Sequence, residues 1–302
     1  MNRRRGFTLV EVMVVMVMML LVGAAVTRIL VNSLRVSQSQ MVTAGMQSNV
    51  RTAGLVLPME LRELGYDTNI YSNAVTSDIE AIGANSISIQ ASRGFSTLCG
   101  AFDFGSDPGE VRFRKPIMGI REPLITDGFQ IYVENDENTG VDDQWATLTV
   151  KAIDLNGECD GGGDPAIVLT LGYPTPVGPG KQLTDANLKV GGPIRWVERM
   201  QFGRFVDDDG MTYVGARSLS LGEAGYSAVA GPLDPATGLQ FFYYDKDGTL
   251  VVPGVGNPLD VRTVEVQLTG RTSTQVAMAG GRRANRAMIT TTRVALRNTL
   301  KR

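Results

Sequence analysis

The sequence predicts an α+β protein in which one long N-terminal helix precedes a large head rich in antiparallel strands. Two observations lead to this fold class. An apolar stretch at residues 7–26 continues into a segment with apolar residues at helical spacing, which ends near residue 65. From residue 66 onward, short β-branched and aromatic segments alternate with Gly, Pro, Asn and Asp, the pattern of strands joined by turns. We therefore expect a helix over 7–65 and a β-rich head over 66–302.

Composition limits the classes of protein to which this chain can belong. Its 302 residues carry 29 Lys and Arg against 31 Asp and Glu, a formal net charge of −2. This balance argues against a dedicated nucleic-acid surface, so nucleic acid is not expected as a partner. The chain contains no histidine, which excludes Ser-His-Asp and Cys-His catalysis and histidine-ligated metals. We predict that the protein is not an enzyme and needs no cofactor.

The N-terminal segment has the features of a membrane-inserted helix. Three arginines at positions 3–5 precede the apolar residues 7–26, which at about 1.5 Å per residue match a hydrocarbon thickness of roughly 30 Å. The arginines predict that this end stays in the cytoplasm. Glu11 needs a partner, because a carboxylate at the centre of a membrane helix costs on the order of 2.5–3.5 kcal/mol. A secretory signal cleaved near residues 23–25 is the alternative, but the helical pattern continues past that point.

The segment Gly6-Phe7-Thr8-Leu9-Val10-Glu11 followed by an apolar helix resembles the class III signal of type IV pilins and type II secretion pseudopilins. The resemblance implies a leader peptide of residues 1–6, cleavage by a prepilin peptidase between Gly6 and Phe7, and N-methylation of Phe7. It also implies that Glu11 pairs with the N-terminal amine of a neighbouring subunit during assembly. Major pilins often carry a kinking proline where this chain has Thr27 and Arg28, so a continuous helix is expected here.

Beyond the membrane, the helix is expected to be amphipathic and to pack on the head. Pro58 is expected to kink it or to begin a new helix, because proline lacks the backbone N–H, and Gly65 is the predicted stop. The ending Leu61-Arg62-Glu63-Leu64-Gly65-Tyr66 resembles the LR-x-x-GY end of the helix in PilW-type minor pilins.

The head is predicted to consist of short strands joined by turns. The predicted strands are 86–91, 111–115, 129–134, 146–153, 167–171, 194–205, 211–214, 240–244, 249–252, 261–269 and 288–297. Residues 244–249 are expected to form a hairpin, with Asp-Gly supplying positive φ. The Gly- and Pro-rich stretches 172–180 and 191–193 are expected to be loops that separate two sub-sheets.

Three segments of the head extend the resemblance to PilW-type minor pilins. Residues 145–150 resemble their D-x-L-T-V strand, and residues 294–298 resemble their V-x-L-R-N C-terminal strand. Residues 241–248 resemble the F-x-Y-x-D-x-x-G hairpin that these proteins share with the J-type minor pseudopilin. The order of these segments after the signal carries the resemblance along most of the chain.

The two cysteines, Cys99 and Cys159, leave two alternatives open. In an exported domain they pair as a disulfide, and closing a loop of about sixty residues would stabilise the fold by very roughly 4 kcal/mol in the chain-entropy model. Otherwise they are two buried thiols. The oxidising periplasm expected around the head favours the disulfide.

Two acidic stretches raise the question of calcium. Asp154, Asn156, Glu158 and Asp160 place oxygens at alternate positions, which suits a hard cation. The glycine is not where an EF-hand requires it, however, and no glutamate closes the loop. A solvated acidic loop between strands is the favoured interpretation, and Ca²⁺ is the alternative. Residues 207–210, Asp-Asp-Asp-Gly, are interpreted as a hairpin turn rather than a calcium site.

Arg271, Arg282, Arg283 and Arg286 form a basic patch in the sequence between two late strands. The favoured interpretation is a solvated loop. The alternative is contact with DNA or an acidic partner through charge attraction, although no aromatic residues are interleaved for base stacking. Residues 178–182 lack the spacing of a phosphate-binding loop and are interpreted as a plain loop.

Together, the signal and the head predict a PilW-type minor pilin that helps to prime assembly of a type IV pilus and is incorporated into it, supporting adhesion, twitching or DNA uptake. The resemblance implies as partners the prepilin peptidase, other minor and major pilins, the inner-membrane assembly platform and inner-membrane lipid. We expect a single-pass protein of a bacterial inner membrane with its head in the periplasm, which then enters the pilus at the cell surface. The alternatives are a J-type minor pseudopilin of a type II secretion system and a pilus-tip adhesin or DNA receptor.

Overall fold

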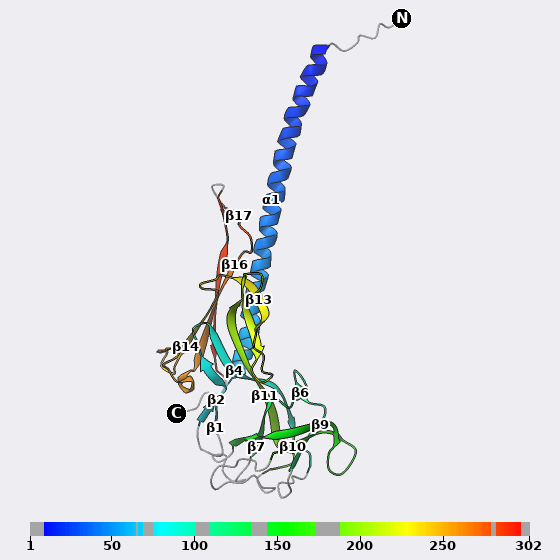
Figure 1. The fold of residues 1–302 in the computed structure, drawn as a ribbon, viewed down its shortest axis with the longest axis vertical. Helices are drawn as coiled ribbons and strands as arrows, with labels where there is room; N and C mark the ends of the chain where they lie inside the picture. Colours follow the sequence, from blue (N-terminus) through cyan, green and yellow to red (C-terminus); the bar gives the residue numbers. More distant parts are fainter. Residues whose placement is uncertain are drawn as a thin grey trace.

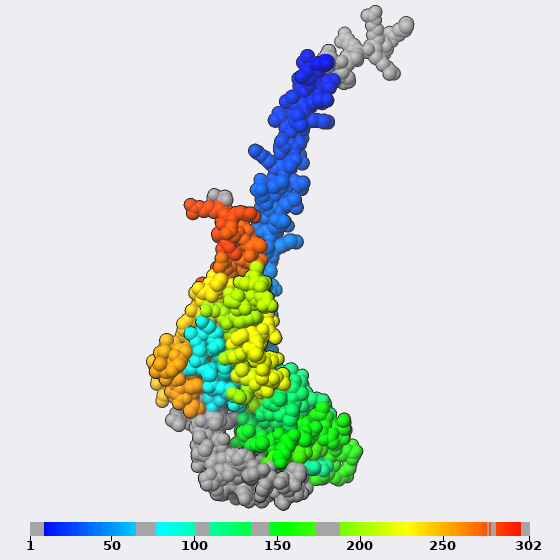
Figure 2. Space-filling model, viewed as in Figure 1, coloured from blue at the N-terminus to red at the C-terminus, as the bar shows by residue number. Residues whose placement is uncertain are grey.

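The fold is a long rod joined to an elongated β-rich head (Figures 1 and 2). The computed structural model describes residues 9–64, 66–68, 75–100, 109–133, 144–172, 188–278 and 282–296. One helix, α1 (Leu9–Arg62), packs into the head through its C-terminal part, and its N-terminal half extends away from the head. The predicted α+β class, one long helix before an antiparallel β-rich head, is confirmed.

Short strands account for nearly all of the regular structure after α1. They are β1 (Tyr66–Thr68), β2 (Val75–Ser77), β3 (Ile79–Ile82), β4 (Ser86–Thr97), β5 (Glu110–Arg114), β6 (Met118–Gly119), β7 (Gly128–Val133), β8 (Gln144–Leu148), β9 (Val150–Glu158), β10 (Pro165–Leu171), β11 (Pro193–Val206), β12 (Thr212–Ser218), β13 (Ser227–Leu233), β14 (Leu239–Tyr244), β15 (Leu250–Val251), β16 (Thr263–Arg271), β17 (Val276–Ala277), β18 (Arg283–Ala284) and β19 (Ala287–Ala295). A 3-10 helix, η1 (Pro258–Asp260), precedes β16.

Helix α1 runs without interruption for 54 residues. It passes through Thr27 and Arg28 as expected for a chain without a proline there. It also contains Pro58, which lies in its last turns, so the helix does not begin anew at this proline. The missing N–H removes one intrahelical hydrogen bond, but Pro58 and its neighbour Leu57 are both buried against the head, and this packing offsets the loss.

The main sheet has 12 strands, and its centre is the antiparallel pair β4 and β11. This pairing extends from Pro193↔Thr97 to Gly203↔Ser86, with one irregularity between Trp196 and Val197. On the far side of β12 and β13, β16 pairs with β14 and with β19. A separate three-stranded sheet has the order β5-β10-β9.

The first hydrophobic core lies between α1 and the main sheet. Val50, Ala53, Leu57 and Leu61 are spaced three or four residues apart, so they share one face of the helix, and all four are buried. They belong to the same cluster as buried residues from the main sheet. This core therefore fixes the C-terminal half of α1 to the head.

The second core belongs to a lobe inserted into the main sheet. Residues 98–192 lie between β4 and β11 in the chain: β6, β7 and β8 extend the main sheet, β5, β9 and β10 form the separate sheet, and buried side chains of β5, β7 and β10 gather around Trp196 of β11. Loops around 172–180 and 191–193 were expected to separate two sub-sheets. These stretches fall in the connection from β10 of the three-stranded sheet to β11 of the main sheet, and β11 contributes Trp196 to the second core and Phe202 to the first. Residues 173–180 lie outside the described residues.

Most predicted strands are present, and the differences have local causes. The strand predicted over 146–153 is two strands, because the chain breaks at Thr149 and β8 pairs with β7 whereas β9 pairs with β10. Strand β13 was not predicted, since its Gly231 and Pro232 are poor strand formers. The hairpin expected at 244–249 is confirmed: the N–H of Asp245 donates to the carbonyl of Thr249 at 3.0 Å, and Gly248 has a φ of 79°.

Candidate functional site

The N-terminal half of α1 is apolar on all sides and exposed. By length and composition, α1 is able to cross a membrane. Its exposed large apolar residues up to the first polar segment are Leu9, Val10, Val12, Met13, Val14, Val15, Met16, Val17, Met18, Met19, Leu20, Leu21, Val22, Val26, Ile29, Leu30, Val31, Leu34 and Val36. A helix that is hydrophobic all round requires lipid or other helices around it. This half of α1 is therefore a surface for insertion or assembly.

Polar groups in this half occupy positions where the helix itself tolerates them. Glu11 lies in the first turn of α1, where the helix dipole favours a carboxylate. The hydroxyl of Thr27 donates to the carbonyl of Gly23 at 2.8 Å, which satisfies it within the helix. Gly6 and Phe7, the predicted cleavage and methylation residues, lie outside the described residues.

The junction between α1 and the head is tightly packed. Ser39 is the first residue of α1 that is partly covered, and Val50 is fully buried. The helix approaches β16 so closely that a Cβ atom on Gly270 would lie 2.2 Å from Cγ2 of Val50. The side-chain amide of Asn49 donates to the carbonyl of Gly231 on β13. The head and the C-terminal half of α1 therefore form one packed unit.

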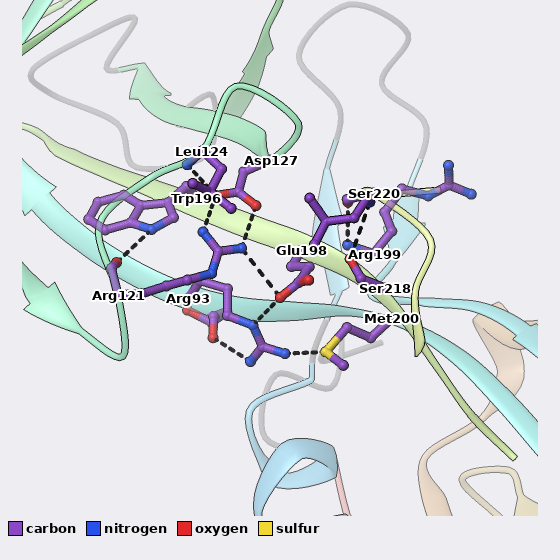
Figure 3. Close-up of polar contacts among 12 residues, drawn as sticks. Arg93, Arg121, Leu124, Asp127, Trp196, Glu198, Arg199, Met200, Ser218 and Ser220 are labelled. Atoms are coloured by element: carbon purple, nitrogen blue, oxygen red, sulfur yellow. Dashed lines mark hydrogen bonds and ion pairs between the residues drawn. The ribbon is translucent and has the colours of Figure 1, made fainter. Parts of the chain in front are cut away.

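A buried charged cluster ties the end of α1 to the centre of the sheet (Figure 3). Nε of Arg93 on β4 lies 2.7 Å from Oε2 of Glu198 on β11. Nη1 of Arg93 lies 3.2 Å from Oε2 of Glu60 on α1, and the same guanidinium contacts the sulfur of Met200. Three elements therefore meet at one arginine.

Arg121, in the connection between β6 and β7, extends this cluster to the inserted lobe. Its guanidinium donates to both carboxylate oxygens of Asp127 at 2.6 and 2.7 Å, and its Nη2 lies 3.3 Å from Oε2 of Glu198. The carbonyl of Arg121 accepts a hydrogen bond from Nε1 of Trp196 at 3.2 Å, which satisfies a buried indole. The cluster thus lies where the two cores meet.

The electrostatics of the cluster keep Glu198 and Arg121 ionised. Burial alone would raise the pKa of Glu198, but hydrogen bonds from Arg93 and Ser218, with the charges of Arg93 and Arg121, hold that pKa below its ordinary value. The pKa of Arg121 is raised because Asp127 accepts its hydrogen bonds and carries the opposite charge. Neither group is poised to exchange a proton near neutral pH, so their arrangement is that of a structural network.

Sequence reasoning missed this cluster, although a signal was present. Glu198 falls on the apolar phase of its strand, two residues from Trp196 and from Met200. Arg93 falls in phase with the buried residues Ile89 and Ala91. A charge on the apolar face of a strand indicates a buried ion pair, but the sequence does not say which charges meet.

Cys99 and Cys159 form a disulfide in the structure, with Cα atoms 5.4 Å apart and a sequence separation of 60. Cys99 follows β4 and Cys159 follows β9. The bond therefore ties the start of the inserted lobe to the far end of its three-stranded sheet.

The acidic stretch considered for calcium is mostly a strand, so the favoured interpretation, a solvated loop between strands, was wrong for it. Asp154, Asn156 and Glu158 belong to strand β9, so their alternate spacing puts them on one exposed face of a strand. Asp160 follows in a turn, where one of its carboxylate oxygens lies 3.6 Å from Arg112. Among the residues that the structure describes, no group of three or more Cys, Asp or Glu is placed to hold a metal ion.

Residues 207–210 form the turn of the β11–β12 hairpin, as predicted. The N–H of Asp207 donates to the carbonyl of Met211 at 3.0 Å, and Gly210 has a φ of 73°. The stretch 178–182 lies outside the described residues.

The four arginines of the basic patch lie around a small hairpin, β17–β18, beside α1. Arg282, Arg283 and Arg286 are exposed. Nη1 of Arg271 lies 3.9 Å from Oδ2 of Asp234. The hairpin is the part of the head that extends farthest toward the N-terminal end of α1 (Figure 1).

Comparisons with known proteins find one similarity, at the N-terminus. Residues 1–27 match the model of the prokaryotic N-terminal methylation motif. No curated protein and no solved structure matches the chain significantly. The matched region contains Gly6, Phe7 and Glu11 and the first part of the exposed apolar helix. This chain therefore carries, ahead of an α+β head, the class III prepilin signal of type IV pilin-like proteins, a signal that implies processing by prepilin peptidase and assembly with other pilins.

Proposed function

We propose that this protein is a minor type IV pilin of the PilW type, which helps to prime assembly of a type IV pilus and is incorporated into it. The observation that carries the proposal is the division of α1. Residues 9–38 are exposed and mostly apolar, whereas Val50, Ala53, Leu57 and Leu61 pack into the head. One half is available to lipid or to other subunits, and the other half holds the head at a fixed position on the rod.

The first stage of this function is anchoring in a bacterial inner membrane. The apolar part of α1 spans the bilayer once, the arginines at positions 3–5 stay on the cytoplasmic side, and the head lies in the periplasm. The prepilin peptidase removes residues 1–6 and methylates Phe7. The assembly platform then extracts the subunit into the fibre, where helices of neighbouring subunits replace the lipid around α1.

Glu11 has the central role when neighbouring helices replace the lipid around α1. Its carboxylate pairs with the N-methylated amine of Phe7 of a neighbouring subunit. In a bundle of apolar helices this attraction is strong, and a carboxylate without the neighbour's amine is costly. The pair therefore selects the register at which one subunit docks beside the next.

The head acts by contact with other minor subunits and carries out no chemistry on a substrate. The Arg93–Glu198 cluster joins its two cores and the Cys99–Cys159 disulfide ties the inserted lobe together, which supports a head that acts as one body in contacts with other subunits. Neither a catalytic residue nor a cofactor is part of the proposal.

The second candidate is a J-type minor pseudopilin of type II secretion, because the signal and the β14–β15 hairpin are common to both resemblances. A tip adhesin or DNA receptor that uses Arg282 and Arg283 is less favoured. These arginines lie at the β17–β18 hairpin, which extends toward the N-terminal end of α1 (Figure 1), the side that in a fibre faces the shaft.

Two experiments test the proposal. Deletion of the gene should abolish or sharply reduce surface pili. Normal pili with lost protein secretion would instead assign the chain to type II secretion. Normal pili with lost binding to surfaces or DNA would identify it as a pilus-tip adhesin or DNA receptor. For the assembly role, Glu11→Ala should leave cleavage and methylation intact, as measured by intact mass, but should lower the amount recovered in sheared fibres.

The matched control for Glu11→Ala is Glu63→Ala, which removes an exposed carboxylate just after α1 and should be incorporated normally. Equal incorporation of the Glu11→Ala protein and the wild type would contradict the pairing role.

A further inference from the structure

The charges of this chain are strongly separated along the molecule. Residues 60–265 contain 15 Lys and Arg against 30 Asp and Glu, whereas residues 1–59 and 266–302 together contain 14 Lys and Arg and a single acidic residue, Glu11. The overall charge of −2 therefore hides an acidic body and two basic segments. Such a separation orients a protein in an electric field or at a charged surface.

The fold brings part of each basic segment together. Helix α1 contributes exposed Arg28 and Arg35 just beyond its apolar stretch. The segment after β16 returns to the same side of the molecule, because β17 lies against α1. Figures 1 and 2 show that this part of the head extends farthest along α1 toward its N-terminal end. Residues far apart in sequence thus form one basic end around the helix.

The hairpin at this end is held firmly while its charges point outward. The N–H of Met278 donates to the carbonyl of Arg282 at 2.8 Å, and Val276 is buried. At its base, the N–H of Thr272 donates to the carbonyl of Arg286 at 2.9 Å, and the N–H of Arg286 donates to the Thr272 hydroxyl at 3.0 Å.

The guanidinium groups of the hairpin itself have no carboxylate partner in the described part of the chain. Arg282, Arg283 and Arg286 are exposed, and none of them forms an ion pair with a described residue. By contrast, Arg93, Arg112, Arg114, Arg121, Arg199 and Arg293 elsewhere in the head each lie within ion-pair distance of a carboxylate. Three exposed arginines without a carboxylate partner among the described residues thus lie on the hairpin whose strand β17 contacts α1.

We propose that the β17–β18 hairpin, through Arg282, Arg283 and Arg286, binds anionic phospholipid headgroups of the membrane into which α1 is inserted. This inference rests on the membrane stage of the proposed function. Ser39, the first partly covered residue of α1, lies about 16 Å of helix beyond Arg28. The hairpin extends from the head toward the N-terminal end of α1 (Figure 1), and charged lipids attract cations over a Debye length of roughly 8–10 Å.

Charge complementarity and position favour lipid over nucleic acid. Each arginine near an anionic surface favours contact by roughly fivefold, and three arginines on a hairpin fixed to α1 meet such a surface as soon as the helix is inserted. A nucleic acid would have to enter the space between head and bilayer. Contact with lipid would hold the head at a fixed tilt while the subunit waits in the membrane, and extraction into a fibre would release it.

The test uses the full chain in nanodiscs of phosphatidylcholine alone and in nanodiscs that also contain phosphatidylglycerol. Backbone amide hydrogen exchange is followed in residues 272–278 and 282–288. Exchange in the hairpin should be several-fold slower in the anionic discs, and high salt should remove the difference. Arg282→Ser/Arg283→Ser should remove it as well, because two arginines account for roughly a 25-fold change in association.

The matched control is Lys151→Ser/Lys246→Ser, which removes two exposed positive charges from the acidic body and should retain the slower exchange. Equal exchange in the two kinds of disc would overturn the proposal. So would protection of the hairpin by added duplex DNA without any effect of phosphatidylglycerol, which would assign the patch to nucleic acid.

Amide exchange in α1 distinguishes a failure of the lipid contact from a failure of the proposed membrane stage. Amides of residues 9–26 should be protected in both kinds of disc if α1 is inserted. If they exchange freely, the membrane stage itself is wrong. If they are protected while the hairpin is indifferent to lipid charge, only the lipid contact is wrong.

Discussion

Nε of Arg93 lies 2.7 Å from Oε2 of Glu198 at a point where Arg93 is 7% and Glu198 is 8% exposed. The two residues are on β4 and β11, the strands from which the inserted lobe leaves the main sheet. Through Glu60 the pair contacts α1, and through Arg121 it contacts the lobe. This single ion pair therefore connects the helix, the sheet and the lobe.

Removing one partner of this buried pair should strongly destabilise the head. Arg93→Met leaves the Glu198 carboxylate buried with only Arg121 beside it, and breaking such a pair costs about 3–5 kcal/mol. Denaturant unfolding of the purified protein measures the change in the free energy of unfolding. Arg199→Met is the control, since Arg199 pairs with Glu80 at 2.6 Å but is 56% exposed in its side chain, and exposed pairs contribute about 0–1 kcal/mol. Equal losses in the two variants would contradict the role of burial.

The pH dependence of stability should show the contribution of the Glu198 carboxylate to the free energy of unfolding. Its pKa is lowered in the folded protein, so its contribution is fully present above the ordinary glutamate pKa of about 4.3 and is lost as the pH falls through the lowered folded value. We expect Glu198→Gln to be less stable than the wild type at pH 7, and to lose less stability as the pH falls below that value. The measurement is the free energy of unfolding between neutral and acidic pH. Parallel curves for the two proteins would refute the assignment.

The disulfide should stabilise the inserted lobe in particular. Reduction or Cys99→Ser opens a loop that spans 60 residues in sequence, with a loss of up to about 4 kcal/mol in the chain-entropy model. The melting temperature should fall on addition of reductant, and Cys99→Ser should show no further response to it. Identical melting with and without reductant would show that the bond contributes nothing.

Gly270 should be intolerant of any side chain, because a Cβ there would lie 2.2 Å from Cγ2 of Val50 and push α1 away from β16. Gly270→Ala is expected to cost about 1–3 kcal/mol, as overpacking does. Gly45→Ala is the control: it lies on α1 with nothing within 4 Å of the new Cβ and should be neutral or stabilising by up to about 1 kcal/mol. Unfolding free energies compare the two variants, and an unaffected Gly270→Ala protein would contradict the close approach seen in the structure.

The sequence by itself determined the anchor and the class of fold. A run of apolar residues of membrane length, three arginines before it and the short signal at Gly6 to Glu11 are local features, and a local pattern suffices to specify a helix and the enzyme that processes it. The alternation of strands and turns likewise identified an antiparallel head, because the side-chain period of a strand is visible in sequence. The hairpins at 207–210 and 244–249 were predictable for the same reason, through glycines at positive φ.

Only the tertiary structure decided which distant residues meet. The pairing of β4 with β11 makes residues 98–192 an insertion and brings Arg93 to Glu198, 105 positions later. The sequence of Asp154 to Glu158 is compatible with a loop or a strand, and these residues form a strand because β9 pairs with β10. In the sequence, the arginines after β16 were interpreted as a solvated loop. Packing of β17 against α1 placed them beside the long apolar helix. Such outcomes depend on long-range packing and register, which local propensity does not encode.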